Sequence, residues 1–139
     1  MNYPRIEDEV IWRQFGELPN FRFSILHIDD AKQRAEVLFK FEEGKPIILH
    51  RHTALNKLLV ISGEHHIYSA AGELKEVRPC GSYTVSEPCD TPHSECGGQG
   101  GAIVLFSIFD NEGKSLYELL DESENVIATL TMADLVALQ

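Results

Sequence analysis

Three histidines in this chain have the type and spacing of a metal-binding set. His50 and His52 stand one residue apart at the end of an apolar run, and His93 follows much later along the chain. Side chains alternate along a β-strand, so His50 and His52 leave the same face if a strand carries them. Three neutral imidazoles suit Zn, Fe, Ni or Cu and leave coordination positions open. The pattern therefore predicts a metal site that does chemistry rather than one that only holds a fold together.

Several residues around His93 leave alternatives open. Glu87 precedes a proline, so its backbone is extended and its side chain has a defined direction, either into solvent or toward a metal's outer shell. Glu95 shares the face of His93 if a strand continues through it, which allows a direct ligand role. Cys89 and Cys96 bracket His93 at a spacing that a zinc knuckle can use, although no second cysteine pair accompanies them.

The elements that must position these residues are mostly short strands. The alternation pattern and turn residues predict strands over 21–28, 35–41, 46–50, 57–61, 66–68, 74–77, 82–85, 102–109, 116–119 and 126–129. Ser62-Gly63 is expected to close one of these strands, and the run Gly97-Gly98-Gln99-Gly100-Gly101 predicts a flexible loop. His65 and His66 come shortly after Gly63, and we expect one of their side chains to point inward and the other outward. Thr131 is expected to cap a short helix over 132–138.

Composition and charge narrow the function classes. The 139 residues suit one domain, and Asp plus Glu outnumber Lys plus Arg by 22 to 12, for a net charge of −10. Such a surface repels phosphate backbones and anionic lipid, so we expect neither nucleic acid nor a membrane as partner. No apolar stretch approaches the ~20 residues of a membrane span, and the acidic N-terminus has no signal core, so the cytoplasm is the default location. Three cysteines, an odd count, agree with a reducing compartment.

The two histidine segments resemble the two motifs of the cupin superfamily. The first motif matches at Gly44, His50, His52, Asn56 and Gly63. Asn56 stands where the usual motif has Glu. The run from Gly81 through Pro88 to His93 resembles the second motif, whose last His is a ligand, with one extra residue between Gly and Pro. The resemblance implies an all-β fold: a polar arm or short helix over residues 1–20, anchored by Trp12, and a single cupin jelly-roll barrel over 21–139.

Within that superfamily, the chain looks most like dioxygenases that cleave acetylacetone or dihydroxyacetophenone, and like the cupin half of ChrR-type anti-sigma factors. Glu87-Pro88 ahead of His93, the missing first-motif Glu and the C-terminal stretch over 106–138 carry this likeness. It implies one divalent metal, Fe(II) in preference to Zn or Ni, on His50, His52 and His93. Glu87 becomes an outer-shell catalytic carboxylate, and the substrate a small diketone or hydroxyketone that chelates the open positions.

Asn56 changes what this site should bind. An amide brings no charge, so it either coordinates weakly through oxygen or holds a water or a neighbouring backbone group. Without the motif carboxylate, the site is expected to be one charge unit more positive, which favours an anionic chelating ligand such as an enolate.

Three functions follow from the resemblance. The first is the dioxygenase. The second is a non-catalytic metal or small-ligand sensor of the ChrR type, although only about twenty residues precede the first strand, where those proteins carry a helical zinc-binding domain. The third is a metal-free isomerase or storage-like cupin. Cupins of this size are commonly homodimers, and an apolar arm around Trp12 supports that expectation.

Overall fold

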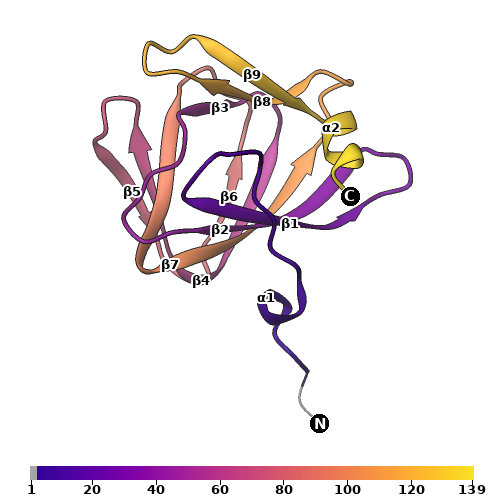
Figure 1. Ribbon diagram of the computed structural model, residues 1–139, viewed down its shortest axis with the longest axis horizontal. Helices are drawn as coiled ribbons and strands as arrows, with labels where there is room; N and C mark the ends of the chain where they lie inside the picture. Colours follow the sequence, from indigo (N-terminus) through magenta and orange to yellow (C-terminus); the bar gives the residue numbers. More distant parts are fainter. Residues whose placement is uncertain (1–2) are drawn as a thin grey trace.

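A curled antiparallel β-sheet makes up most of this computed structural model, which describes residues 3–139 (Figure 1). The strands are β1 (Phe21–Ile28), β2 (Arg34–Phe41), β3 (His50–His52), β4 (Asn56–Ser69), β5 (Leu74–Arg78), β6 (Tyr83–Ser86), β7 (His93–Phe109), β8 (Ser115–Leu120) and β9 (Val126–Thr131). Two short helices accompany them, α1 (Ile6–Glu9) and α2 (Met132–Ala137). Neither is long and apolar enough to cross a membrane. The predicted all-β class is confirmed.

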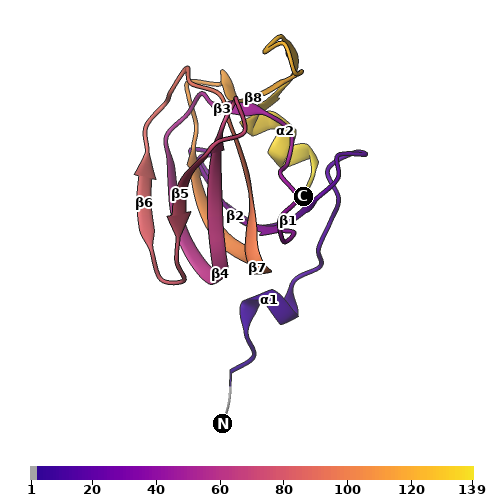
Figure 2. The ribbon, with the colours of Figure 1, turned by 90° about the vertical axis from the view of Figure 1, so that its left-hand side faces the viewer.

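Strand β7 organises the sheet because it pairs with three other strands. The order along the main path is β1-β2-β7-β3-β8-β9, and β4 joins it by pairing with β5, β6 and β7. The first residues of β7 lie beside β3 and the end of β4, whereas its second half runs between β2 and β4. Figure 2 shows the consequence: β5 and β6 lie outermost on one side of the barrel, and α2 lies on the other.

Alternating side chains fill the space that the sheet encloses. Buried and half-buried positions alternate along β4 from Asn56 to Val60, and β2 buries Ala35, Val37 and Phe41 on the same inner face. Each fully buried aliphatic or aromatic side chain contributes about 1.5–3 kcal/mol. Helix α2 adds Met132 and Leu135 to this core. The predicted capping box at its start is confirmed, since the Thr131 side chain accepts from the Asp134 amide and the Asp134 carboxylate accepts from the Thr131 amide.

Two glycine segments were predicted wrongly, for one physical reason. Gly63 does not close a strand: β4 continues through it to Ser69, with register shifts on either side of it. The run 97–101 is not a loop but part of β7. A Cβ on Gly63 would lie 2.0 Å from the Gly101 carbonyl oxygen, and one on Gly97 would lie 2.5 Å from the Gly101 backbone. Gly63 lets β4 approach β7 closely, and Gly97 lets β7 fold tightly on itself at its bulge. A glycine that permits close packing has the same local pattern as one that permits flexibility.

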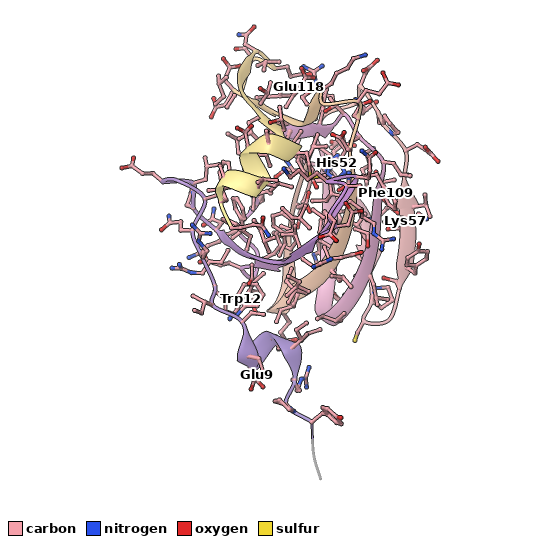
Figure 3. The ribbon with its side chains drawn as sticks, turned by 90° about the vertical axis from the view of Figure 1, so that its right-hand side faces the viewer. Glu9, Trp12, His52, Lys57, Phe109 and Glu118 are labelled. Carbon is pink, nitrogen blue, oxygen red and sulfur yellow. The ribbon has the colours of Figure 1, made fainter. Side chains whose placement is uncertain are left out.

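The second half of the N-terminal arm lies against the barrel of its own chain, whereas α1 projects away from it (Figure 1). Helix α1 spans one turn, and Met1 and Asn2 of the predicted arm lie outside the described residues. Further along, the backbones of Arg13 and Phe23 exchange hydrogen bonds of 2.8 and 2.9 Å. The Lys40 ammonium lies 5.5 Å from the centroid of the Trp12 ring (Figure 3), so this anchor contacts β2. The expected homodimer stays a prediction.

Candidate metal centre

Four side chains from two adjacent strands converge on the inner face of the barrel. His50 and His52 come from β3, and His93 and Glu95 come from β7, where His50 is the direct cross-strand partner of His93. Both pairs have the spacing i, i+2, so strand alternation turns all four side chains to one side. One ligand atom from each residue lies within 4.8 Å of the other three. The sequence-derived histidines are therefore brought together, and Glu95 joins them.

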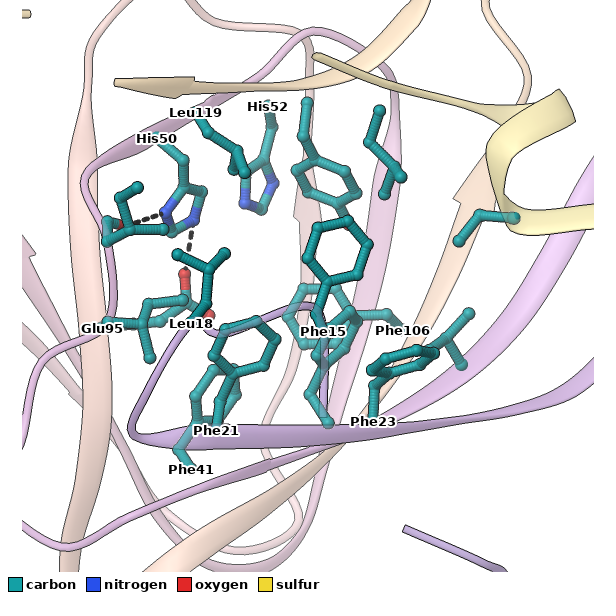
Figure 4. A pocket seen from close by; sticks show the side chains of 17 residues that line it. Phe15, Leu18, Phe21, Phe23, Phe41, His50, His52, Glu95, Phe106 and Leu119 are labelled. Carbon is teal, nitrogen blue, oxygen red and sulfur yellow. Dashed lines mark hydrogen bonds and ion pairs between the residues drawn. The ribbon is translucent and has the colours of Figure 1, made fainter. Parts of the chain in front are cut away.

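Glu95 is the most heavily bonded member of this group. Its Oε2 lies 2.8 Å from His50 Nε2 (Figure 4) and 3.3 Å from His93 Nε2. Its Oε1 accepts from His65 Nε2 at 3.0 Å. The carboxylate is only 2% exposed. His65, which is fully buried on β4, stacks on Phe41 with a centroid separation of 5.0 Å. The stacked ring fixes the direction of the hydrogen bond that orients Glu95.

His52 is the member whose contacts call for a further ligand. It is 4% exposed, and neither ring nitrogen has a hydrogen-bond partner in residues 3–139. A buried polar group left unpaired costs about 1–3 kcal/mol, so this ring is stable here only if something else satisfies it. Its centroid lies 4.7 Å from that of His93 and 5.4 Å from that of His50. An imidazole nitrogen facing two others and a carboxylate fits a divalent metal.

The second nitrogen of His50 is already fixed by the backbone. Its Nδ1–H donates to the Ile48 carbonyl at 2.7 Å, which leaves Nε2 for the centre of the group. Metal-binding histidines commonly have such a carbonyl partner, because it sets the tautomer and the ring orientation. The donor set of three imidazoles and one carboxylate suits Fe(II), Zn and Ni alike.

Charge is distributed unevenly among the four side chains. Burial lowers the pKa of His50, but the hydrogen bond and negative charge of Glu95 outweigh it and raise the pKa above its usual 6.5. Burial raises the pKa of Glu95, yet the bonds from His50, His65 and His93 hold it well below 4.5. Burial, with His93 and His50 nearby, holds the pKa of His52 well below 6.5. Without metal, a proton held between His50 and Glu95 takes the place that a cation would fill.

Asn56 is not part of the group. It is fully buried, its Nδ2 donates to the Ala54 carbonyl at 3.1 Å, and its Oδ1 accepts from the Tyr117 hydroxyl at 2.6 Å. The backbone-holding alternative for Asn56 is therefore confirmed. Burial, followed by the charge of Glu95, raises the pKa of Tyr117 well above 10, which keeps this hydroxyl a donor. The expectation of a more positive site is wrong, because Glu95 supplies the carboxylate that the first motif lacks.

The remaining candidates from the second motif lie apart. Glu87 is exposed and lines neither of the cavities described below, so its outer-shell catalytic role stays a prediction. Cys96 follows Glu95 on β7 and leaves the opposite face, where its thiol lies 3.6 Å from the Tyr68 hydroxyl. Cys89 is exposed. Within the described residues, the two thiols and His93 do not assemble into a zinc knuckle.

Two cavities meet at the four-residue group. The first, here called the apolar chamber, is lined mainly by aromatic and aliphatic side chains, and His50, His52 and Glu95 form its polar end (Figure 4). Phe15 and Leu18 of the arm close part of it. The second cavity is here called the polar pocket. Three residues of the group line it, together with the polar side chains of Glu76, Arg78, Ser86 and Thr91. His52 and Glu95 line both cavities, so the group forms the wall between them.

Sequence reasoning undervalued Glu95 and His65. The signal for Glu95 was present, because His93-Ser94-Glu95 repeats the i, i+2 spacing of His50-Arg51-His52. Its use depended on the strand continuing through Glu95, which the structure shows for β7. No local signal marks His65 as the inward member of its pair, since that depends on the bulge beside Gly63.

Comparison with known proteins identifies the architecture. No protein-family model matches the sequence, and no curated protein matches it either. Among solved structures, an RmlC-like cupin from Ralstonia eutropha matches with a TM-score of 0.73 and 18% identity, covering 94% of this chain and 79% of that one. This chain folds as a cupin. The barrel predicted from the two motifs is thereby confirmed.

Two further solved structures share this architecture. An acetylacetone dioxygenase from Acinetobacter johnsonii matches with a TM-score of 0.67 and 15% identity, over 99% of this chain and 89% of that one. The anti-sigma factor ChrR, solved in complex with SigE of Rhodobacter sphaeroides, matches with a TM-score of 0.57 and 22% identity, over 74% of this chain and 51% of that one. At such identities the likeness shows the shared cupin fold alone.

Proposed function

We propose that this cupin is a metal-dependent dioxygenase that cleaves a small diketone or hydroxyketone. The observation that carries the proposal is the convergence of His50, His52, His93 and Glu95 within 4.8 Å at the junction of two cavities. His50, His52 and His93 would hold Fe(II), with Zn or Ni as alternatives. The resemblance to diketone-cleaving cupins supplies the reaction class.

A metal at this position supplies the Lewis acidity and the redox chemistry that oxidative cleavage of a carbon–carbon bond requires. The chain supplies the surroundings. His65 and Ile48 orient Glu95 and His50 through hydrogen bonds of 3.0 and 2.7 Å. The apolar chamber excludes water from one side of the group, which strengthens the electrostatic interactions there. His93, whose side chain is 23% exposed, faces the polar pocket and leaves an approach for substrate.

Anaerobic loading with Fe(II), followed by oxygen-electrode measurements, tests the proposal. Addition of acetylacetone or a hydroxyketone should consume O2 in proportion to substrate, and mass spectrometry should detect two carbonyl or carboxyl fragments. The variant His52→Ala serves as the control for adventitious iron chemistry. Iron held stoichiometrically without any substrate-dependent O2 uptake across the panel would count against the dioxygenase.

A metal sensor of the ChrR type is the second candidate, and Glu95 is the observation that favours it. Three imidazoles and a carboxylate can complete a four-coordinate site, which is the arrangement of structural rather than catalytic zinc. Under this alternative the purified protein holds zinc, consumes no O2 with any ketone, and binds an added sigma factor. The dioxygenase predicts the opposite result for O2 uptake and for sigma-factor binding, and these two measurements decide between the candidates.

A further inference from the structure

The polar pocket offers more room beside the group than the apolar chamber does. Its volume is about 220 Å³, against about 70 Å³ for the chamber. Three of the four members of the group, His52, His93 and Glu95, line it. A ligand that approaches the group from this side can therefore reach it without displacing the packed phenylalanines of the barrel interior.

Arg78 gives this pocket a specific chemical character. It ends β5, opposite His65 of β4, and is the one Lys or Arg among the described residues that line the pocket. Its side chain is 17% exposed, and one guanidinium nitrogen, Nη2, contacts the Glu76 carboxylate at 2.9 Å. Its Nε is buried and has no hydrogen-bond partner in residues 3–139. A guanidinium carries five N–H donors, so the Glu76 contact leaves most of them available.

Glu76 limits what Arg78 can attract, because it also lines the pocket and brings a negative charge. It holds the guanidinium by one edge and so presents the remaining donors in a fixed orientation. A planar carboxylate can accept two parallel N–H bonds from such a fork, which is the strongest pairing that Arg makes. The hydroxyl groups of Ser86 and Thr91 line the same pocket and add polar partners for its oxygens.

We propose that the polar pocket is a carboxylate subsite, and that the substrate is a diketo or hydroxyketo acid rather than a neutral diketone. The inference rests on the proposed function and narrows it. The carboxylate of the substrate pairs with Arg78, and its carbonyl oxygens face His52, His93 and Glu95. The charged end must occupy this side, because the opposite cavity is apolar apart from the shared wall.

Two ligands that differ in one group test the subsite. Acetylpyruvate is acetylacetone with one methyl group replaced by a carboxylate. Anaerobic calorimetric titration of the purified, metal-containing protein prevents turnover and gives a Kd for each. We expect acetylpyruvate to bind at least about tenfold more tightly, the usual size of a charge-assisted contact. In Arg78→Met the two Kd values should come within about twofold of each other. Arg78→Lys, which keeps the charge but loses the fork, should fall between.

Variants of neighbouring charges separate recognition from stability. Lys75→Met removes a cation from the same strand that pairs with Glu73 outside the pocket, and should leave the ratio of the two Kd values unchanged. Glu76→Gln removes the competing carboxylate and should increase the preference for acetylpyruvate over acetylacetone. If the Arg78–Glu76 ion pair is purely structural, a substitution of either residue should lower the melting temperature and leave that preference unchanged. Equal affinities for acetylpyruvate and acetylacetone overturn the subsite, as does a preference for acetylpyruvate that survives Arg78→Met. The proposed function stands in either case if acetylacetone still binds and is consumed. Binding of neither ligand, with metal present, overturns the proposed function as well.

Discussion

The apolar chamber and the polar pocket share a wall but are built in different ways. The chamber is formed by phenylalanines from the arm, β1, β2 and β7, whereas the pocket is formed by β4, β5 and the segment between β6 and β7. The same four side chains therefore have a low-dielectric environment on one side and hydrogen-bonding groups on the other. Under the proposed function, this difference would place a polar substrate on one side and leave the water-poor chamber for a small apolar molecule such as O2.

The strongest way to break this division is to remove the shared wall. His52→Ala removes a proposed metal ligand that lines both cavities, and should join them at that point. We expect metal affinity to fall by more than about a hundredfold, since even outer partners of metal ligands are worth tenfold to a hundredfold. Competition with a fluorescent chelator measures the loss.

The fold of His52→Ala should survive, because the native ring has no hydrogen bond to lose within the described chain. Metal-free wild type and variant should therefore have similar circular dichroism spectra and cooperative unfolding transitions. If the variant keeps its metal, the assignment of His52 to the centre is wrong.

Glu95→Gln should have the next largest effect. The amide keeps the shape of the carboxylate but loses the charge that draws His50, His65 and His93 together. We expect metal affinity to fall about tenfold to a hundredfold. Metal-free protein should lose about 1–3 kcal/mol of unfolding free energy, since hydrogen bonds to a charged group are replaced by weaker ones. Chemical denaturation of both forms measures this, and an unchanged affinity would place Glu95 outside the centre.

Sequence alone could predict the three histidines of the wall as metal ligands, whereas the place of Glu95 beside them was only one alternative. Strand alternation made His50 and His52 share a face, and the motif spacing added His93. Glu95 obeys the same alternation, but its strand continues through a glycine run in which Gly97 pairs with His65 of β4. That pairing joins residues that are far apart in the sequence, which leaves no local pattern to read.

The polar pocket was harder still to foresee. Arg78 reaches it through pairing of β5 with β4, while Ser86 and Thr91 come from a different segment. The chamber was easier, because its phenylalanines occupy alternate positions of strands that the hydrophobic pattern predicted. Regular, buried regions follow from periodicity, whereas polar recognition surfaces depend on how edges and loops meet.

Asn56→Ala tests the chamber side of the comparison. Asn56 accepts from the Tyr117 hydroxyl, and Tyr117 lines the chamber. Without this acceptor a buried hydroxyl is unpaired, so we expect a loss of about 1–3 kcal/mol in unfolding free energy with metal content unchanged. Tyr117→Phe in the same background should recover part of that loss. A fall in metal content like that of His52→Ala would instead make Asn56 a ligand, as the usual cupin motif has it.

The stability of the metal-free protein should depend on pH through His52 and His50, which form part of the wall. A His52 pKa held below 6.5 in the folded state means that the unfolded chain binds a proton first as pH falls. The His52 contribution to stability is therefore present above pH 6.5 and is lost below it, by at most about 1.4 kcal/mol per pH unit. His50, with a raised pKa, acts in the opposite sense and loses its contribution as pH rises above 6.5. Chemical denaturation between about pH 7.5 and about pH 5.5 should show that the unfolding free energy of His52→Ala rises relative to that of wild type as the pH falls.

The smallest effect is expected at Glu87, where the second motif and the structure differ most. The resemblance places a catalytic carboxylate here, yet the side chain is exposed and outside both cavities. A solvated carboxylate outside the lining interacts weakly with a reacting group, because water and salt screen its charge. Glu87→Gln should leave metal content unchanged and lower kcat/KM by less than about threefold, or about 0.7 kcal/mol. A loss of about tenfold or more at constant metal content would show that the segment between β6 and β7 folds inward when substrate is bound, and would return Glu87 to the catalytic role that the motif implies.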